Sequence, residues 1–310
     1  MTFALIRVAA GPRLGLGHVR RAETLVRALG RPCVLSVRGA GQVRGGVPVV
    51  PAAGPGATLD AVRPRVLVLD DPRQGSSHPW CVAARRQGVP VVSIHDLGLA
   101  SVPSDLAIDG SIVRRGRLAA RRSLRGPEFA VIATPRRRRR GGRVRRVLVS
   151  LGGGPRVTLA ARLASMLHRR WPALDILVTG GEGDGDGFAW VTAPLGLAPW
   201  LARVDAAILG GGVSLYEAVA AGVPSIGLAV VAAQQPTIRG FAARGLVLDA
   251  GLASRRADGP ASVVRQMDRL LADGPWRAHA AVEGPRVLDG GGAARVARAI
   301  VALVEGASRG

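Results

Sequence analysis

Short apolar runs alternate with helix-like segments along almost the whole chain of 310 residues. Runs of this kind, rich in Val, Ile and Leu, predict the strands of parallel sheets that are covered by helices on both faces. They form two sets, at residues 3–8, 34–37, 66–69 and 91–94 and at residues 147–151, 176–178, 206–209 and 225–229. The sequence therefore predicts an α/β protein with two doubly wound, Rossmann-like domains that face a central cleft.

Five consecutive arginines, Arg136 to Arg140, separate the two sets of runs. Like charges in a row repel one another and bury no apolar surface, so residues 135–146 are predicted to form an exposed linker. We therefore expect an N-terminal domain over residues 1–134 and a C-terminal domain over residues 147–310, whose last helix could pack back on the first domain. Contact of these arginines with phosphate or a membrane surface is the alternative.

The composition argues against a nucleic-acid partner despite a formal net charge of +22. The chain has neither Lys nor Asn, whose codons are A-rich, so coding bias accounts for part of its arginine excess. With one Tyr and four Phe, it also offers few aromatic rings on which bases could stack. Loose contact of the arginines with an anionic membrane surface stays open.

The remaining composition points to a cytoplasmic protein without a metal site. Cys33 and Cys81 lie far apart and form no Cys-x-x-Cys or Cys/His cluster, so both are predicted to be buried small hydrophobes in a reducing compartment. Residues 1–7 lead directly into a predicted strand without a signal-peptide pattern. No uncharged apolar run reaches the roughly 18 to 20 residues that span a bilayer.

The motif Gly15-Leu16-Gly17-His18 lies between an apolar run and an amphipathic segment, and so predicts a strand, a glycine turn and a helix that begins near His18. A helix N-terminus presents free N–H groups and a partial positive charge, which disfavours an imidazolium. We therefore expect a neutral His18 at pH 7 that faces the cleft and serves as a general base. A polar residue in the first helical turn, without catalytic role, is the alternative.

A second glycine turn, Gly210-Gly211-Gly212, follows a predicted strand and opens a helix that carries Ser214 and Glu217. Backbone N–H groups at such a helix start favour a diphosphate, and Glu217 could accept hydrogen bonds from a ribose. Alternatively, Ser214 and Glu217 form a capping box that only stabilises the helix.

Two further segments could face the same ligand. Ser150-Leu151-Gly152-Gly153-Gly154 is another strand-to-glycine turn, and Gln234-Gln235 follows the predicted strand at residues 225–229. A tight turn and polar loop residues without a ligand are the respective alternatives.

In their order along the chain, these motifs resemble those of the nucleotide-sugar hydrolases of pseudaminic acid biosynthesis and the related spore-coat polysaccharide proteins. These are glycosyltransferase-like proteins of the GT-B fold, more distantly similar to the MurG-type glycosyltransferases. The matching segments are Arg7, Gly15-x-Gly17-His18-Val19-x-Arg21, Asp70, His95-Asp96, residues 126–130, Val149-Ser150-Leu151-Gly152-Gly153, Gly211-Gly212 through Glu217, Gly222-Val223-Pro224-Ser225, Gln234-Gln235 and residues 289–293.

The resemblance implies a uridine nucleotide sugar as substrate and no cofactor or metal. It makes His18 the base that activates a water for attack on the anomeric carbon, in surface-glycan or flagellar-glycan biosynthesis. The substrate-binding residues that it implies are Arg7, Gly17, Arg21, Asp70, Gly153, Gly211, Gly212, Ser214, Glu217, Gln234 and Gln235.

The chain departs from the family pattern at several positions. Ala9 stands where the family usually has Asp, and Gly154-Pro155-Arg156 stands where an acidic residue is usual. A small glycosyltransferase of the same fold, in which an acceptor hydroxyl replaces water, is the second interpretation. A nucleotide-sugar-binding protein without catalytic activity is the third, and the missing acidic residues argue for it, whereas His18 argues against it.

Overall fold

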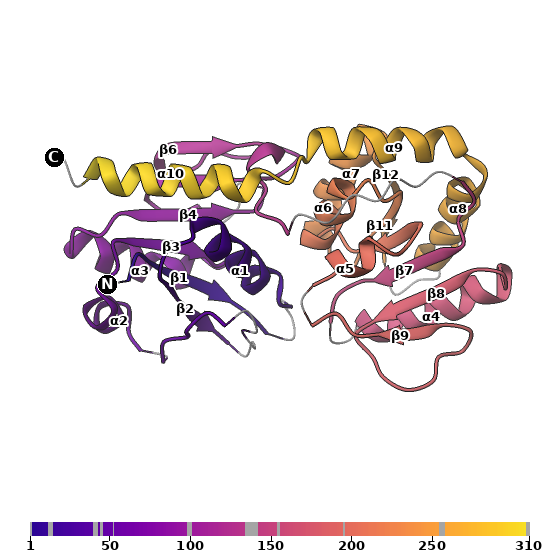
Figure 1. Ribbon diagram of the computed structural model, residues 1–310, viewed down its shortest axis with the longest axis horizontal. Helices are drawn as coiled ribbons and strands as arrows, with labels where there is room; N and C mark the ends of the chain where they lie inside the picture. Colours follow the sequence, from indigo (N-terminus) through magenta and orange to yellow (C-terminus); the bar gives the residue numbers. More distant parts are fainter. Residues whose placement is uncertain are drawn as a thin grey trace. The chain divides into compact units, whose positions relative to one another are not determined.

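The computed structural model divides into two compact units, Met1–Ile132 with Gly291–Gly310, and Ala133–Gly290 (Figure 1). It describes residues 2–11, 15–39, 43, 46–51, 53–97, 101–133, 142–153, 156–194, 196–253 and 258–307. The arginine run Arg136 to Arg140 lies outside the described residues.

The first unit contains a parallel sheet of six strands in the order β2-β1-β3-β4-β5-β6. Four of them, β1 (Ala4–Ala9), β2 (Cys33–Arg38), β3 (Val66–Asp70) and β4 (Val91–His95), occupy the predicted apolar runs. The sequence did not predict β5 (Ser104–Asp109) and β6 (Ala120–Arg125). Strand β6 carries three arginines and lies at the edge of the sheet. Edge strands often carry charged side chains, which oppose pairing with another chain.

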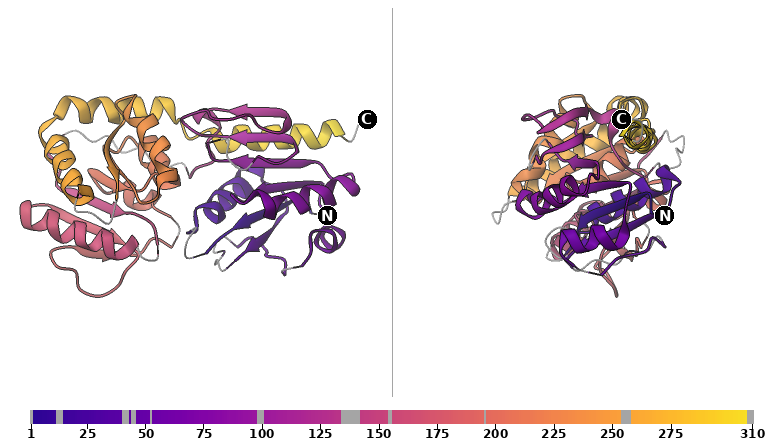
Figure 2. Two further views of the ribbon diagram at one scale, coloured as in Figure 1. Left: turned by 180° about the vertical axis from the view of Figure 1, so that it is seen from behind. Right: turned by 90° about the vertical axis from the view of Figure 1, so that its left-hand side faces the viewer.

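Helices cover both faces of this sheet (Figures 1 and 2). Helices α1 (Gly17–Leu29) and α10 (Gly292–Ala307) pack on one face through a core that includes Ile6, Leu25 and Ile300. Helices α2 (Pro55–Val62) and α3 (Gln74–Arg86) pack on the other face through Leu5 and Trp80. A short 3-10 helix, η1 (Pro127–Phe129), follows β6.

Both cysteines are buried and unpaired, as the sequence predicts. Burial raises the pKa of the Cys33 and Cys81 thiols to about 11.

The second unit contains another parallel sheet of six strands, in the order β12-β11-β10-β7-β8-β9. Its strands are β7 (Arg146–Ser150), β8 (Asp175–Thr179), β9 (Ala189–Val191), β10 (Ala206–Leu209), β11 (Ser225–Ala229) and β12 (Val247–Leu252). Helices α4 (Arg156–Arg170) and α8 (Asp258–Ala272) pack on one face, with Leu163 and Met267 in the core.

The opposite face of this sheet carries α6 (Val213–Ala220) and α7 (Gln235–Ala242), whose Tyr216 and Phe241 rings meet edge to face at 4.9 Å between centroids. The remaining helices are α5 (Ala198–Leu201), η2 (Ala232–Gln234) and α9 (Gly274–Val287). Two doubly wound parallel sheets with helices on both faces confirm the predicted α/β class.

The strand order of each sheet defines one switch point, where chain connections run away in opposite directions. It lies between β1 and β3 in the first unit and between β7 and β10 in the second. Open α/β sheets bind ligands outside the carboxyl ends of the strands at this point. The loops that follow these four strands are therefore the expected positions of ligand-binding residues.

Helix α10 is the last helix of the chain, and it belongs to the first unit. Its first residue, Gly292, lies so close to the backbone of Ala130 that a Cβ atom would stand 2.2 Å from the carbonyl oxygen. Glycine at this position is thus a packing requirement of the helix start.

We predict that Gly292→Ala lowers the free energy of unfolding by about 1–3 kcal/mol, because the added methyl group must push α10 away from Ala130. Gly306→Ala in the same helix is the control, since a Cβ there meets open space. It should leave stability unchanged or raise it by up to about 1 kcal/mol. Urea denaturation of both variants measures the difference, and equal stabilities would contradict the packing argument.

Candidate active site

Four ionisable side chains meet at the switch point of the first sheet. His18 and Arg21 come from the first turns of α1, Asp70 is the last residue of β3, and Asp96 follows the end of β4. The 3.6-residue period of the helix places His18 and Arg21 on the same side of α1. Because β3 and β4 are neighbours and parallel, their carboxyl ends bring the two carboxylates to the same edge.

His18 forms an ion-pair contact with Asp70, with 2.8 Å between Nδ1 and Oδ1. A carboxylate only accepts hydrogen bonds, so Nδ1 carries the proton that Asp70 accepts. Nε2 is then the basic nitrogen, and it has no hydrogen-bond partner among the described residues. The His18 side chain is 14% exposed. An imidazole held through Nδ1 by a carboxylate is the arrangement of a general base.

Arg21 is buried, and its N–H groups are occupied by the two carboxylates. Nε donates to Asp70 Oδ2 at 2.7 Å and Nη2 to Asp70 Oδ1 at 2.5 Å. Nη1 donates to Asp96 Oδ1 at 2.7 Å and Nη2 to Asp96 Oδ2 at 3.1 Å. A buried guanidinium is stable only when it is paired in this way. Arg21 therefore fixes the positions of both carboxylates.

The pKa of Asp70 is well below its usual range. Burial alone would raise the pKa of this carboxyl group, but the charges of Arg21 and His18 and their hydrogen bonds lower it further than burial raises it. Asp70 is therefore ionised.

The pKa of His18 is raised, which is opposite to the direction that the helix N-terminus alone would favour. Burial lowers the pKa of the imidazole, but the charge of Asp70 and its hydrogen bond raise it by more. A full carboxylate charge at 2.8 Å outweighs the partial charge of a helix end. The argument from the helix N-terminus did not include Asp70, which is 52 residues away in the chain.

Arg7, which the resemblance implies as a substrate contact, does not join this cluster. It alternates along β1 with Ile6 and Val8, which face α1, so its side chain lies on the opposite face of the sheet. There Arg7 Nη1 donates to Ser36 Oγ at 2.8 Å, and the guanidinium lies 5.0 Å from the centre of the Trp80 ring. Gly17 is the first residue of α1.

Some of the predicted residues of the second unit lie together at its own switch point. Gly210 N donates to Ser150 O at 3.3 Å, and a Cβ on Gly210 would stand 3.5 Å from both the Gln234 amide and the Leu151 carbonyl. Gly211 has no room for a Cβ, which would lie 2.7 Å from Gln234 O. The loops after β7, β10 and β11 are therefore packed together around these glycines.

The start of α6 rules out the capping box. Its N-cap residue is Gly212, without a side-chain hydrogen bond, and the helix begins at Val213. A capping box requires the hydroxyl residue at the N-cap position, whereas Ser214 lies inside the first turn. Glu217 is buried in the following turn. The N–H groups at this helix start are thus left without a side-chain cap.

Gln234, Gln235 and the glycine turn after β7 lie in different surroundings. Gln234 Oε1 accepts a hydrogen bond from Val230 N at 2.9 Å, so it holds the loop after β11. Gln235 is the first residue of α7. Gly153 is exposed, while Gly154 and Pro155 lie outside the described residues.

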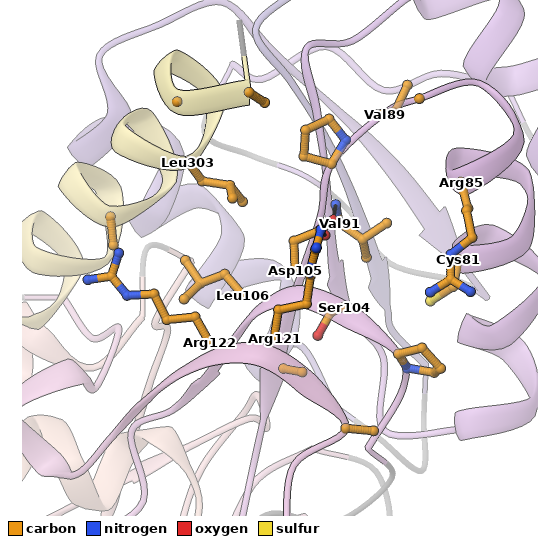
Figure 3. Close-up of a pocket in the computed structure, with 18 of the residues that line it drawn as sticks. Cys81, Arg85, Val89, Val91, Ser104, Asp105, Leu106, Arg121, Arg122 and Leu303 are labelled. Atoms are coloured by element: carbon orange, nitrogen blue, oxygen red, sulfur yellow. Dashed lines mark hydrogen bonds and ion pairs between the residues drawn. The ribbon is translucent and has the colours of Figure 1, made fainter. Parts of the chain in front are cut away.

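A cavity of about 980 Å³ lies at the opposite edge of the first sheet, at the starts of β4, β5 and β6 (Figure 3). Arg85, Arg121 and Leu303 are among its lining residues, and none of the predicted site residues takes part. The sequence did not predict this cavity.

In the part of the chain that the structure describes, no cluster of His, Cys, Asp and Glu could hold a metal ion. No described helix is long and apolar enough to cross a membrane.

Comparison with solved structures defines the fold as GT-B. A glycotransferase of kitacinnamycin matches 96% of this chain and 98% of its own with a TM-score of 0.69 at 15% identity. MurG of Acinetobacter baumannii matches with a TM-score of 0.62 at 14% identity, covering 96% of this chain and 99% of its own. The spinosyn rhamnosyltransferase SpnG, in complex with thymidine diphosphate, matches 93% of this chain and 96% of its own with a TM-score of 0.64 at 16% identity.

In sequence, the chain is similar to the spore coat polysaccharide biosynthesis protein SpsG of Bacillus subtilis (strain 168). The two are 37% identical over 109 residues, which are 35% of this chain and 32% of the relative. The match thus spans about a third of the length of SpsG. No family model matches the chain.

We predict that Asp70→Asn lowers the free energy of unfolding at pH 7 by about 3–5 kcal/mol, since the variant leaves the buried Arg21 without its closest charge partner. Asp60→Asn, at an exposed position of α2, should change it by no more than about 0.5 kcal/mol.

The pH dependence gives a second measurement. A lowered folded-state pKa stabilises the fold above the usual carboxyl value of 3.8, and this stabilisation disappears as pH falls through the lower folded value. The difference between wild type and Asp70→Asn should therefore be smaller at pH 3 than at pH 7. A difference that grows towards low pH would refute the charged pair.

Proposed function

We propose that the protein binds a nucleotide-activated sugar and cleaves it at the anomeric carbon, with water as the nucleophile. The observation that carries this proposal is the His18–Asp70 pair at the switch point of a sheet in a glycosyltransferase-like fold. The similarity to SpsG favours a role in polysaccharide biosynthesis, with a surface or flagellar glycan as the product that we infer.

In the proposed reaction, His18 Nε2 takes a proton from water while the water oxygen forms a bond to the anomeric carbon. The bond between that carbon and the diphosphate oxygen breaks, and its electron pair leaves with the nucleoside diphosphate. Asp70 stabilises the imidazolium that forms and keeps the ring oriented. A positioned general base of this kind contributes about 10²- to 10⁴-fold to the rate.

Asp70 and Arg21 act in this proposal through His18 rather than by contact with substrate. The resemblance implies substrate contacts for both, but both side chains are buried and hydrogen-bonded within the cluster. We therefore assign them as positioning residues. Arg7 stays a proposed substrate contact, on the other face of the sheet, and Gly17 a proposed backbone contact beside His18.

In this proposal, the second unit contains the nucleotide-binding site. Gly211, Gly212 and Ser214 surround the uncapped start of α6, where N–H groups and the helix dipole favour a diphosphate. Glu217 lies one turn further along and would accept hydrogen bonds from ribose. Gly153, Gln234 and Gln235 would contact the nucleotide sugar from the neighbouring loops. Solved structures of SpnG and SsfS6 in complex with thymidine diphosphate support a nucleoside diphosphate as ligand, and we propose uridine as the base.

A glycosyltransferase is the second candidate, because the structural relatives named above are glycosyltransferases. In that reaction an acceptor hydroxyl replaces water at His18 Nε2. Incubation with a panel of UDP- and dTDP-sugars without any acceptor separates the two candidates. Release of free nucleotide identifies a hydrolase, whereas release only after addition of an acceptor identifies a transferase.

We predict that Glu217→Gln weakens UDP binding, because the variant loses the charge that strengthens the ribose hydrogen bonds. The expected loss is about 1–3 kcal/mol in isothermal titration calorimetry. Glu283→Gln, on α9 of the same unit, should bind UDP like the wild type. A lowered melting temperature with unchanged UDP affinity would refute the ribose contact.

We predict that His18→Ala lowers turnover about 10²- to 10⁴-fold and leaves the Kd for UDP within a few-fold of wild type. The exposed His78→Ala in α3 is the matched control and should keep wild-type turnover. Because the base must be neutral, the wild-type rate should fall as pH drops through a pKa above 6.5, and the variant should lose this limb. Wild-type turnover in His18→Ala would overturn the mechanism.

A further inference from the structure

We propose that Asp96 is a positioning residue that stabilises the protonated form of His18 through Arg21. This inference rests on the proposed function, in which His18 is the base. Asp96 belongs to the His95-Asp96 motif of the resemblance, which assigned it no role, and the role proposed here follows from the geometry of the cluster.

One nitrogen atom connects the three partners. Arg21 Nη2 lies 3.0 Å from His18 Nδ1, 2.5 Å from Asp70 Oδ1 and 3.1 Å from Asp96 Oδ2. Because both atoms lie within 3.1 Å of the same nitrogen, Asp96 Oδ2 and His18 Nδ1 are no more than about 6 Å apart. At this distance an opposite charge favours the charged form of a titratable group.

The number of charges explains why a second carboxylate is needed. Arg21 and Asp70 alone form a neutral pair, so a protonated His18 beside them would add an uncompensated positive charge in a buried place. Asp96 adds one negative charge, which the imidazolium then balances. Since unpaired charges are costly away from water, the cluster with both carboxylates favours the proton that His18 takes up during the reaction.

The charged groups that face His18 come from three elements: Arg21 from α1 itself, Asp70 from β3, and Asp96 from the loop after β4. Arg21 opposes protonation of His18, whereas both carboxylates favour it. Asp70 touches the ring directly and also orients it. Asp96 binds Arg21 rather than the ring, so its charge can be removed while Asp70 keeps the ring in position.

Removal of the Asp96 charge should leave the fold intact. The Asp96 side chain is 60% exposed, whereas that of Arg21 is 8% exposed and keeps its two hydrogen bonds to Asp70. In Asp96→Asn, the amide oxygen can still accept a hydrogen bond from Arg21 Nη1. The variant therefore changes charge and little else.

The test is an NMR titration of the His18 Cε1–H signal in the full chain without ligand. The chain has five histidines, and the His18 signal is identified by its absence from the His18→Gln spectrum. We expect the pKa of His18 to fall by about half a pH unit or more in Asp96→Asn. Asp96→Glu, which keeps the charge, should restore most of the wild-type value, and Asp60→Asn should not change it.

Several outcomes decide the inference. An unchanged His18 pKa in a folded Asp96→Asn overturns it, even where the melting temperature falls, because a purely structural role would give that result. Asp96→Ser, which also removes the charge, is measured in the same way should Asp96→Asn not fold.

The inference and the proposed function can fail separately. With a sugar nucleotide that is turned over, the low-pH limb of the rate should move to lower pH in Asp96→Asn by the same amount as the pKa. A lower His18 pKa in Asp96→Asn, together with wild-type turnover in His18→Ala, would refute the base and keep the electrostatic inference. Loss of turnover in His18→Ala with an unchanged pKa in Asp96→Asn would do the reverse.

Discussion

The buried guanidinium of Arg21 is the interaction on which the active edge of the first unit depends. It joins the start of α1 to the ends of β3 and β4 through four hydrogen bonds to two carboxylates. Without this cation, Asp70 and Asp96 would repel each other at the same sheet edge. Arginine suits the position better than lysine because its planar fork meets two carboxylates at once and keeps its charge when buried.

The two units place different groups at the same topological position. In the first, the switch point gathers titratable side chains, which can move a proton. In the second, it gathers glycines and the uncapped start of α6, which offer backbone N–H groups without side chains in the way. Side chains suit acid–base work, whereas backbone dipoles suit an anion whose charge does not change. The doubly wound sheet supplies the position, and the local residues decide its use.

Much of the fold could be predicted from the sequence because central strands are apolar runs. The edge strands β6 and β9 and the Asp-containing strands β5 and β12 were not predicted, since they are short or their apolar runs are interrupted by polar residues. In the site, His18 was identified by its glycine turn, but its pairing with Asp70 spans 52 residues and depends on which strands are neighbours. The effect of this carboxylate on the His18 pKa could not be predicted for the same reason. Asp96 was part of the His95-Asp96 motif of the resemblance but was not predicted as a site residue, although its place two residues after a predicted strand was the signal that could have identified it.

The cluster determines how strongly His18 holds a proton, and it leaves the choice of nucleophile to other residues. Asp70 and Asp96 raise the basicity of Nε2, which helps proton transfer, but a stronger base is protonated over a wider pH range and then cannot act. If His18 is the base, as proposed, the two carboxylates shift its working range towards higher pH. In the two proposed reactions, water and an acceptor hydroxyl would both give their proton to this nitrogen. A hydrolase and a transferase can thus share this cluster, and the difference between them lies in what reaches Nε2.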